Sequence, residues 1–144
     1  MIPLAIRYLD ASALAKRYVA EPGTERVMRW LAEGLPATSR LSQVEVTSAL
    51  ARRCREGAIS AAGRDRALAA LAADLAALNV VEVAPEIAAL AGRLLLRHAL
   101  RAGDSLQLAS ALFLARRVSG PVEFLAFDER LTEAARREGL AIPA

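Results

Sequence analysis

The chain is 144 residues long and 55% hydrophobic, a composition that supports a buried core and excludes an intrinsically disordered protein. Its formal net charge is +3 and almost all of its basic residues are arginine, which favours an anionic partner, although genomic base composition also enriches arginine, alanine and leucine. A single cysteine and a single histidine exclude a disulfide framework and a zinc site built from those residues. Hydrolytic chemistry would therefore rest on carboxylates or on the one histidine.

The first predicted element is a strand over Leu4–Leu9, an apolar run that only Arg7 interrupts. It ends at Asp10, Ser12 follows, and a helical pattern begins at once with Leu14. Asp10 taken alone is most simply a helix N-cap. A carboxylate at this point is also typical of ligand sites, because parallel α/β sheets bind ligands beyond the carboxyl ends of their strands.

The next segment reads as a helix, a short strand and a second helix. A turn at residues 21–23 precedes the first of these helices, and residues 35–39 form the predicted strand. Ser42 and Glu45 then have the spacing of a capping box at the start of the second helix. Three arginines crowd the end of that helix, where cations suit its dipole: Arg52, Arg53 and Arg55.

A stripe of leucines at helical spacing marks the helix that follows Ser60. Its members are Leu68, Leu71, Leu75 and Leu78. We expect this helix to form a hairpin with the arginine-bearing helix before it. The stripe should be buried on the domain or in a dimer interface.

Strands and helices alternate again in the C-terminal half. The predicted elements are a strand over 79–83, a helix over 85–98, a helix from about 103, a strand over 124–126, a last helix and a possible edge strand over 140–142. Strands separated by helices imply a parallel sheet with helices on both faces. The prediction is therefore one α/β domain over residues 1–144, with a central sheet of four or five strands.

The start of the chain and its hydropathy predict a cytoplasmic protein. The sequence MIPLAIRYLD has neither a basic leader nor an apolar region long enough for a signal peptide. No uncharged apolar run approaches the roughly 18–20 residues of a membrane span. We therefore expect no membrane association.

Four carboxylates stand at the predicted strand ends and helix starts: Asp10, Glu45, Asp104 and Asp128. One by one, each is explained as a helix cap or as part of a capping box. In a parallel sheet, however, all four junctions can converge on one edge. Carboxylates about 4 Å apart repel by roughly 4 kcal/mol per pair, so a shared pocket would require a cation. Hard oxygen ligands select Mg²⁺ or Mn²⁺.

Four segments, in this order, closely resemble the signature segments of PIN-domain ribonucleases, with the VapC toxins of toxin–antitoxin pairs as the nearest branch. They are YLDASALAKRY, SQVEVTSALARR, LRAGDSLQLASAL and FLAFDERLTEAARREGL. The resemblance covers nearly the whole chain and implies a PIN-like three-layer α/β/α fold. It implies that the four carboxylates are catalytic and that Asp10, Asp104 and Asp128 hold Mg²⁺ or Mn²⁺. Ser12 stands where the family supports the first aspartate with a hydroxyl, and Lys16 matches a frequent toxin position.

Two positions depart from the family pattern. Ala126 stands where many relatives carry threonine or serine, and Gln107 stands where histidine is common. A missing hydroxyl near the site loosens metal geometry, because such partners orient the ligands. All four acids are present, so an active enzyme is still expected.

The resemblance implies an endoribonuclease in which water attacks an RNA phosphodiester, leaving a 5′-phosphate and a 3′-hydroxyl. It also implies a homodimer and a small cognate antitoxin that covers the active site. Two alternatives stay open: a housekeeping RNA-processing PIN nuclease without an antitoxin, and a catalytically weak PIN-fold binding module.

Overall fold

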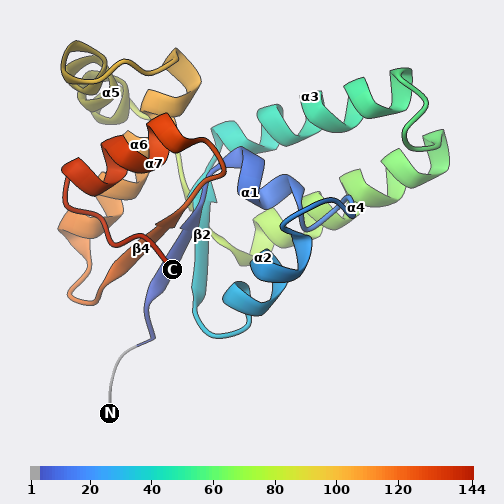
Figure 1. Ribbon diagram of the computed structural model, residues 1–144, viewed down its shortest axis with the longest axis horizontal. Helices are drawn as coiled ribbons and strands as arrows, with labels where there is room; N and C mark the ends of the chain where they lie inside the picture. The colour runs from blue at the N-terminus through green and yellow to red at the C-terminus, as the bar shows by residue number, and fades with distance from the viewer. Residues whose placement is uncertain (1–3) are drawn as a thin grey trace.

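The computed structural model describes residues 4–144, which form a four-stranded parallel sheet between two layers of helices (Figure 1). The strand order across the sheet is β3-β2-β1-β4. In chain order the elements are β1 (Ile6–Leu9), α1 (Ala11–Ala15), α2 (Thr24–Leu31), β2 (Leu35–Ser39), α3 (Leu41–Arg55), α4 (Ala61–Ala77), β3 (Asn79–Val81), α5 (Pro85–Arg97), α6 (Ala102–Arg117), β4 (Val122–Leu125) and α7 (Glu129–Arg137). The expected α/β/α architecture is confirmed.

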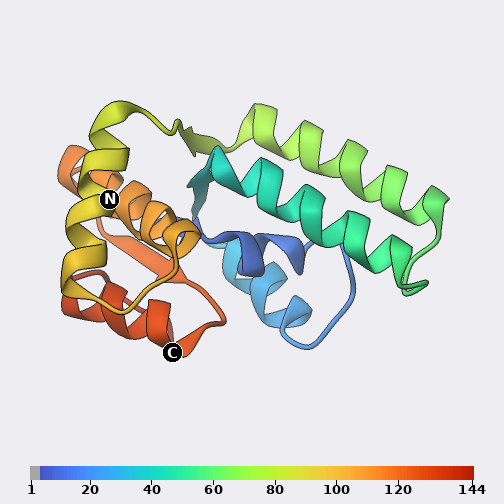
Figure 2. The same ribbon diagram turned by 90° about the horizontal axis from the view of Figure 1, so that it is seen from above.

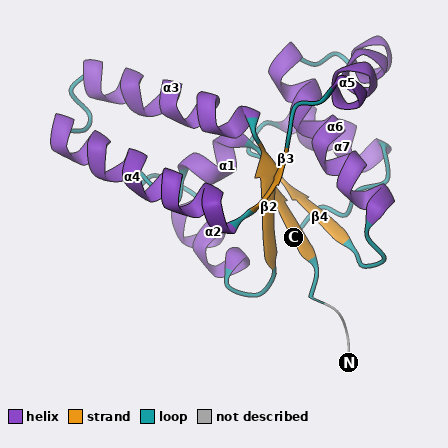
Figure 3. Ribbon diagram, turned by 180° about the vertical axis from the view of Figure 1, so that it is seen from behind, coloured by secondary structure: helices purple, strands orange, loops and turns teal. Residues whose placement is uncertain are grey.

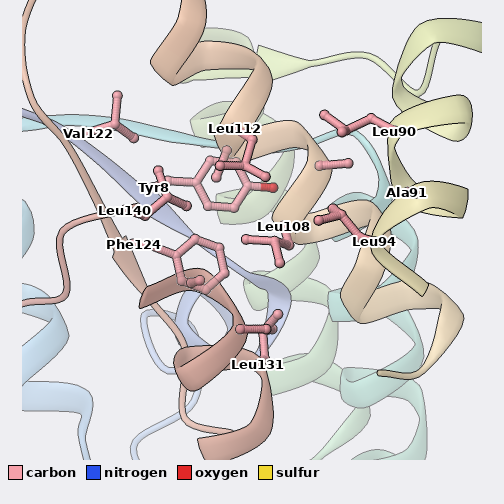
Figure 4. Close-up of a cluster of buried hydrophobic side chains, with 14 of the residues drawn as sticks. Tyr8, Leu90, Ala91, Leu94, Leu108, Leu112, Val122, Phe124, Leu131 and Leu140 are labelled. Carbon is pink, nitrogen blue, oxygen red and sulfur yellow. The ribbon is translucent and has the colours of Figure 1, made fainter. Parts of the chain in front are cut away.

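The sheet is built around β1, whose successive side chains pack into two hydrophobic cores, one on each face of the sheet. Tyr8 and Leu9 are both fully buried and, because side chains alternate along a strand, they point to opposite faces. Tyr8 stacks on Phe124 of β4 with ring centroids 5.5 Å apart. Figure 4 shows this pair among leucines that include Leu108 of α6 and Leu131 of α7. Burial on both faces explains why β1 is apolar at nearly every position.

The helices divide between the two faces of the sheet. α5, α6 and α7 cover one face, while α1, α2 and the α3–α4 pair lie on the other (Figure 2). α3 and α4 run side by side as a hairpin that extends beyond the sheet (Figure 3). Leu71 and Leu75 of α4 are buried, and Leu68 and Leu78 are partly buried against the same core. The predicted hairpin and its buried leucine stripe are confirmed.

Three predicted strands differ from the observed ones by two residues at one end, and one of them is β1, which starts at Ile6 and not at Leu4. β3 ends at Val81, two residues earlier than predicted, and β4 starts at Val122, two residues earlier than predicted. Residues 140–142 form only an isolated bridge, in which Ala141 pairs with Glu123. The backbone hydrogen bond that joins this segment to β4, from Phe124 N to Ala141 O, is too little to make a strand. No helix within residues 4–144 combines the length and the apolar character that a membrane crossing requires.

Candidate active site

The four predicted carboxylates line one pocket at the carboxyl ends of the strands. Asp10 follows β1, Glu45 lies near the start of α3, Asp104 is in the first turn of α6, and Asp128 follows β4. Together they line a cavity of ≈ 600 Å³. The parallel topology brings Asp10, Glu45 and Asp128 together, because it places the strand-to-helix junctions at the same edge of the sheet. Asp104 reaches this edge from the connection between α5 and α6.

Asp10 is the most buried of the four, with 4% of its surface exposed. Its Oδ1 accepts hydrogen bonds from the backbone N–H of Ala13 at 2.9 Å and from the Ser12 hydroxyl at 2.7 Å. The predicted N-cap of α1 is therefore confirmed. Its Oδ2 accepts no hydrogen bond from residues 4–144 and is left to the pocket.

Burial raises the pKa of Asp10 from 3.8 to about 7. The hydrogen bonds from Ala13 and Ser12 oppose this rise, and the nearby charges of Asp104 and Glu45 add to it. Asp10 forms no ion pair with a basic residue among those described. A carboxyl that is buried, faced by other carboxylates and without a cationic partner is typical of functional sites.

The structure contradicts the predicted capping box at Ser42 and Glu45. α3 begins at Leu41 and its N-cap is Arg40, whose side chain makes no cap hydrogen bond; the Ser39 hydroxyl instead accepts from Leu41 N at 3.0 Å. The Ser42 hydroxyl is buried and bonds with the Thr38 hydroxyl at 2.7 Å. The Glu45 carboxylate accepts from Gln107 Nε2 at 2.9 Å. The capping box does not form, because the Ser42 and Glu45 side chains hydrogen-bond to residues of other elements instead.

An arginine bridges the two remaining acids. Arg101 Nε lies 3.4 Å from Asp104 Oδ2, and its Nη2 lies 3.7 Å from Asp128 Oδ2. The other oxygen of Asp128 accepts from Leu131 N at 3.0 Å, so Asp128 is the N-cap of α7, as the cap reading predicts. Asp104 is not a cap, because the N-cap of α6 is Arg101. The Arg101 side chain is 81% exposed and therefore free to leave this position.

Ser12 connects two sides of the pocket. Its hydroxyl donates to Asp10 and accepts from Phe127 N at 3.4 Å, in the loop that leads to Asp128. Ala126, in the same loop, is 9% exposed and offers no hydroxyl. Ser12 therefore supports the loop through Phe127 as well as the first aspartate.

Lys16 does not line the pocket. Its ammonium group pairs with Glu21 at 3.1 Å and lies over the Phe127 ring, 4.4 Å from the ring centroid. Through Phe127, Lys16 contacts the loop before Asp128, so a lysine at position 16 has a structural explanation. Sequence reasoning missed Arg101 and the contact of Gln107 with Glu45. Arg101 is separated from Asp104 by only two residues in LRAGD, a spacing that could have signalled the pair.

The donor set fits a hard divalent cation. Carboxylate oxygens are the ligands that Mg²⁺ and Mn²⁺ select. One of the carboxylates here, Asp10, is buried and has no basic partner among the residues described. Among the side chains described, no three of histidine, cysteine, aspartate and glutamate already stand close enough to hold one ion. The pocket is therefore an open acidic site, in which enclosing a cation requires side-chain rotation.

The family model of the PIN domain matches residues 7–137. No curated protein matches the sequence.

Several solved structures share the fold at low sequence identity. VapC20 from Mycobacterium tuberculosis, described as a Sarcin-Ricin loop cleaving toxin, is 22% identical with a TM-score of 0.67, covering 89% of this chain and 94% of that one. FitAcB from Neisseria gonorrhoeae is 15% identical with a TM-score of 0.69, covering 96% of each chain. VapBC2 from Rickettsia felis, bound to a promoter DNA fragment, is 12% identical with a TM-score of 0.65, covering 96% of this chain and 97% of that one.

Proposed function

This chain belongs to the PIN domain family, and from that membership we propose that it is a cytoplasmic, single-domain, metal-dependent endoribonuclease acting as the toxin of a type II toxin–antitoxin pair. The observation that carries the proposal is the convergence of Asp10, Glu45, Asp104 and Asp128 on one pocket. The similarity of the fold to VapC20, VapBC2 and FitAcB supports the toxin assignment.

Asp10, Asp104 and Asp128 would hold Mg²⁺ or Mn²⁺, and Glu45 would complete the site directly or through water. A divalent cation there would supply Lewis acidity for the attack of water on an RNA phosphodiester. The new P–O bond replaces the bond to the 3′-oxygen, which leaves as a hydroxyl, and the 5′-phosphate stays on the other product. Ser12 keeps Asp10 oriented throughout, because its hydroxyl donates to Oδ1 at 2.7 Å.

In the proposed function, two arginines at the pocket bind the RNA backbone. Arg52 and Arg101 both line the acidic cavity. A neighbouring cavity of ≈ 710 Å³ shares Arg101, Asp104 and Asp128 with it, so these residues lie between two adjoining cavities. In this role Arg101 exchanges its ion pairs with the two aspartates for the phosphate, which a guanidinium binds through paired donors.

The proposed partners are the RNA substrate, a cognate antitoxin and a second copy of this chain. The antitoxin follows from the resemblance to the VapC toxins, and the fold shared with VapC20, which is described as a toxin, supports it. A short antitoxin reading frame beside the gene would support the same assignment.

Expression of the protein alone, followed by an RNA cleavage assay, tests the proposal. The wild type should arrest growth and cleave labelled RNA in Mn²⁺ and not in EDTA, while Asp104→Asn should do neither. Asp65→Asn, on the exposed face of α4, is the matched control and should behave as wild type. Cleavage without growth arrest would point to a housekeeping nuclease. The absence of both, with folded protein, would leave a binding module and refute the proposal.

A further inference from the structure

A buried glutamine sits at the centre of a hydrogen-bond network behind the acidic pocket. Gln107 is 1% exposed, and its Oε1 accepts from the Tyr8 hydroxyl at 2.6 Å. Its Nε2 donates to Ser42 Oγ at 3.0 Å and to Glu45 Oε1 at 2.9 Å. Both N–H groups of the amide are therefore used, one of them on a carboxylate of the site.

The donors and acceptors from Thr38 to Gln107 can be assigned by starting at Thr38. The Thr38 hydroxyl donates to the Leu9 carbonyl at 2.8 Å, so its oxygen has to accept from Ser42. Ser42 then accepts from Gln107, because its own proton is already donated. The amide is fixed in one orientation, with its nitrogen toward Ser42 and Glu45. Since a carboxamide does not titrate, this donor faces Glu45 at any pH at which the protein is folded.

The second oxygen of Glu45 lies against a glycine. A Cβ on Gly103 would come within 3.1 Å of Glu45 Oε2. Gly103 lies in the first turn of α6, beside Asp104, and its φ angle is not positive. The glycine is therefore not needed for an unusual backbone conformation. Its effect is to leave room for the carboxylate.

We propose that Gln107 and Gly103 are positioning residues that set the Glu45 carboxylate for the cation and the RNA phosphate. Gln107 holds Oε1, and Gly103 gives Oε2 a place at the start of α6, next to Asp104. Glu45 thus keeps one oxygen for the pocket while the other is tied to the core. This inference rests on the proposed function, because it specifies how one acid of that site is held.

Mn²⁺ binding measured by calorimetry without RNA tests the role of Gln107. Gln107→Leu removes both donors at similar size and should weaken Mn²⁺ binding roughly 10- to 100-fold. Leu71→Ala is the control, because Leu71 is also buried but belongs to the second core, in α4, away from this network. It should bind Mn²⁺ as the wild type does.

A double substitution separates an effect through Glu45 from a general loss of structure. Glu45→Gln removes the charge and still offers an oxygen to Gln107, so it should weaken Mn²⁺ binding without loosening the network. In the Glu45→Gln background, Gln107→Leu should then cause no further loss of affinity. Equal losses in both backgrounds would overturn the proposal.

Gly103→Ala keeps the proposal testable if Gln107→Leu does not fold. Alanine favours a helix over glycine, so the melting temperature in EDTA should match or exceed that of the wild type. Mn²⁺ binding should nevertheless weaken, because the new methyl group displaces Glu45 Oε2. A purely structural role would move both quantities in the same direction.

Two outcomes distinguish a failure of the proposed function from a failure of this inference. A wild type that binds no Mn²⁺ and cleaves no RNA would overturn the proposed function together with this inference. A wild type that binds Mn²⁺ through Asp10, with Gln107→Leu and Gly103→Ala binding equally well, would overturn this inference alone.

Discussion

Replacing Asp10 with asparagine tests the electrostatics of the acidic pocket most directly. Asparagine keeps the size of the side chain and caps a helix about as well as aspartate, so Ala13 and Ser12 keep their acceptor. The substitution removes a charge that is 4% exposed and leaves the surrounding contacts in place. Without metal, Asp10→Asn should therefore stabilise the protein at pH 8.

The size of this gain follows from the pKa of Asp10, which burial raises from 3.8 to about 7. Each pH unit of difference between the folded and unfolded pKa is worth about 1.4 kcal/mol, so the ionised group destabilises the fold by roughly 4 kcal/mol. The folded state binds the Asp10 proton more tightly than the unfolded state does. The stability that protonated Asp10 contributes is therefore fully present below pH 3.8 and is lost as the pH rises through 7. The gain from Asp10→Asn should grow from roughly 2 kcal/mol at pH 5 to roughly 4 kcal/mol at pH 8.

The assay is urea unfolding of both proteins in EDTA at several pH values. Asp65→Asn serves as the control, because its carboxylate is exposed and does not line the pocket. Asp104 and Glu45 face Asp10 in both proteins, and their repulsion contributes to the same difference. A gain that does not change between pH 5 and pH 8, or a loss of stability at pH 8, would refute the reasoning.

The same protein also reports on the cation. Mn²⁺ at a hundredfold excess over its dissociation constant should stabilise the wild type by about 2.7 kcal/mol, and Asp10→Asn by far less. A wild type whose unfolding midpoint does not respond to Mn²⁺ would contradict the shared acidic pocket.

Three further substitutions have distinct expected outcomes. Arg101→Ala should tighten Mn²⁺ binding, because the guanidinium lies 3.4 Å from Asp104 and 3.7 Å from Asp128, and calorimetry checks this. The same substitution should reduce the salt dependence of RNA binding by roughly one phosphate contact, which filter binding at several salt concentrations measures. Asp128→Asn should keep the cap on Leu131 and raise the melting temperature in EDTA, while shrinking the rise that Mn²⁺ produces. Leu71→Ala, at a position 2% exposed in α4, should lower the free energy of unfolding by about 2–5 kcal/mol and leave Mn²⁺ affinity unchanged, as urea unfolding and calorimetry can show.

The sequence by itself determined the layer order and the places where acids can meet. Short strand-like segments such as Leu4–Leu9 and residues 35–39, alternating with helical patterns, are enough to predict a parallel sheet. Because such a sheet gathers its strand-to-helix junctions at one edge, the positions of Asp10 and Asp128 already placed them near each other. The caps at these two residues were also predictable, since they depend on backbone groups three residues away.

The tertiary structure decided which partner each side chain takes. Glu45 and Ser42 fit a local capping motif, yet they bond to Gln107 and Thr38, and the Gln107–Glu45 contact joins residues 62 positions apart. The pKa of Asp10 depends on burial by segments distant in the chain, which no local pattern reports. Local hydrogen bonds follow from sequence spacing because the backbone fixes their geometry. Contacts between elements depend on how the whole chain packs, so only the folded molecule shows them.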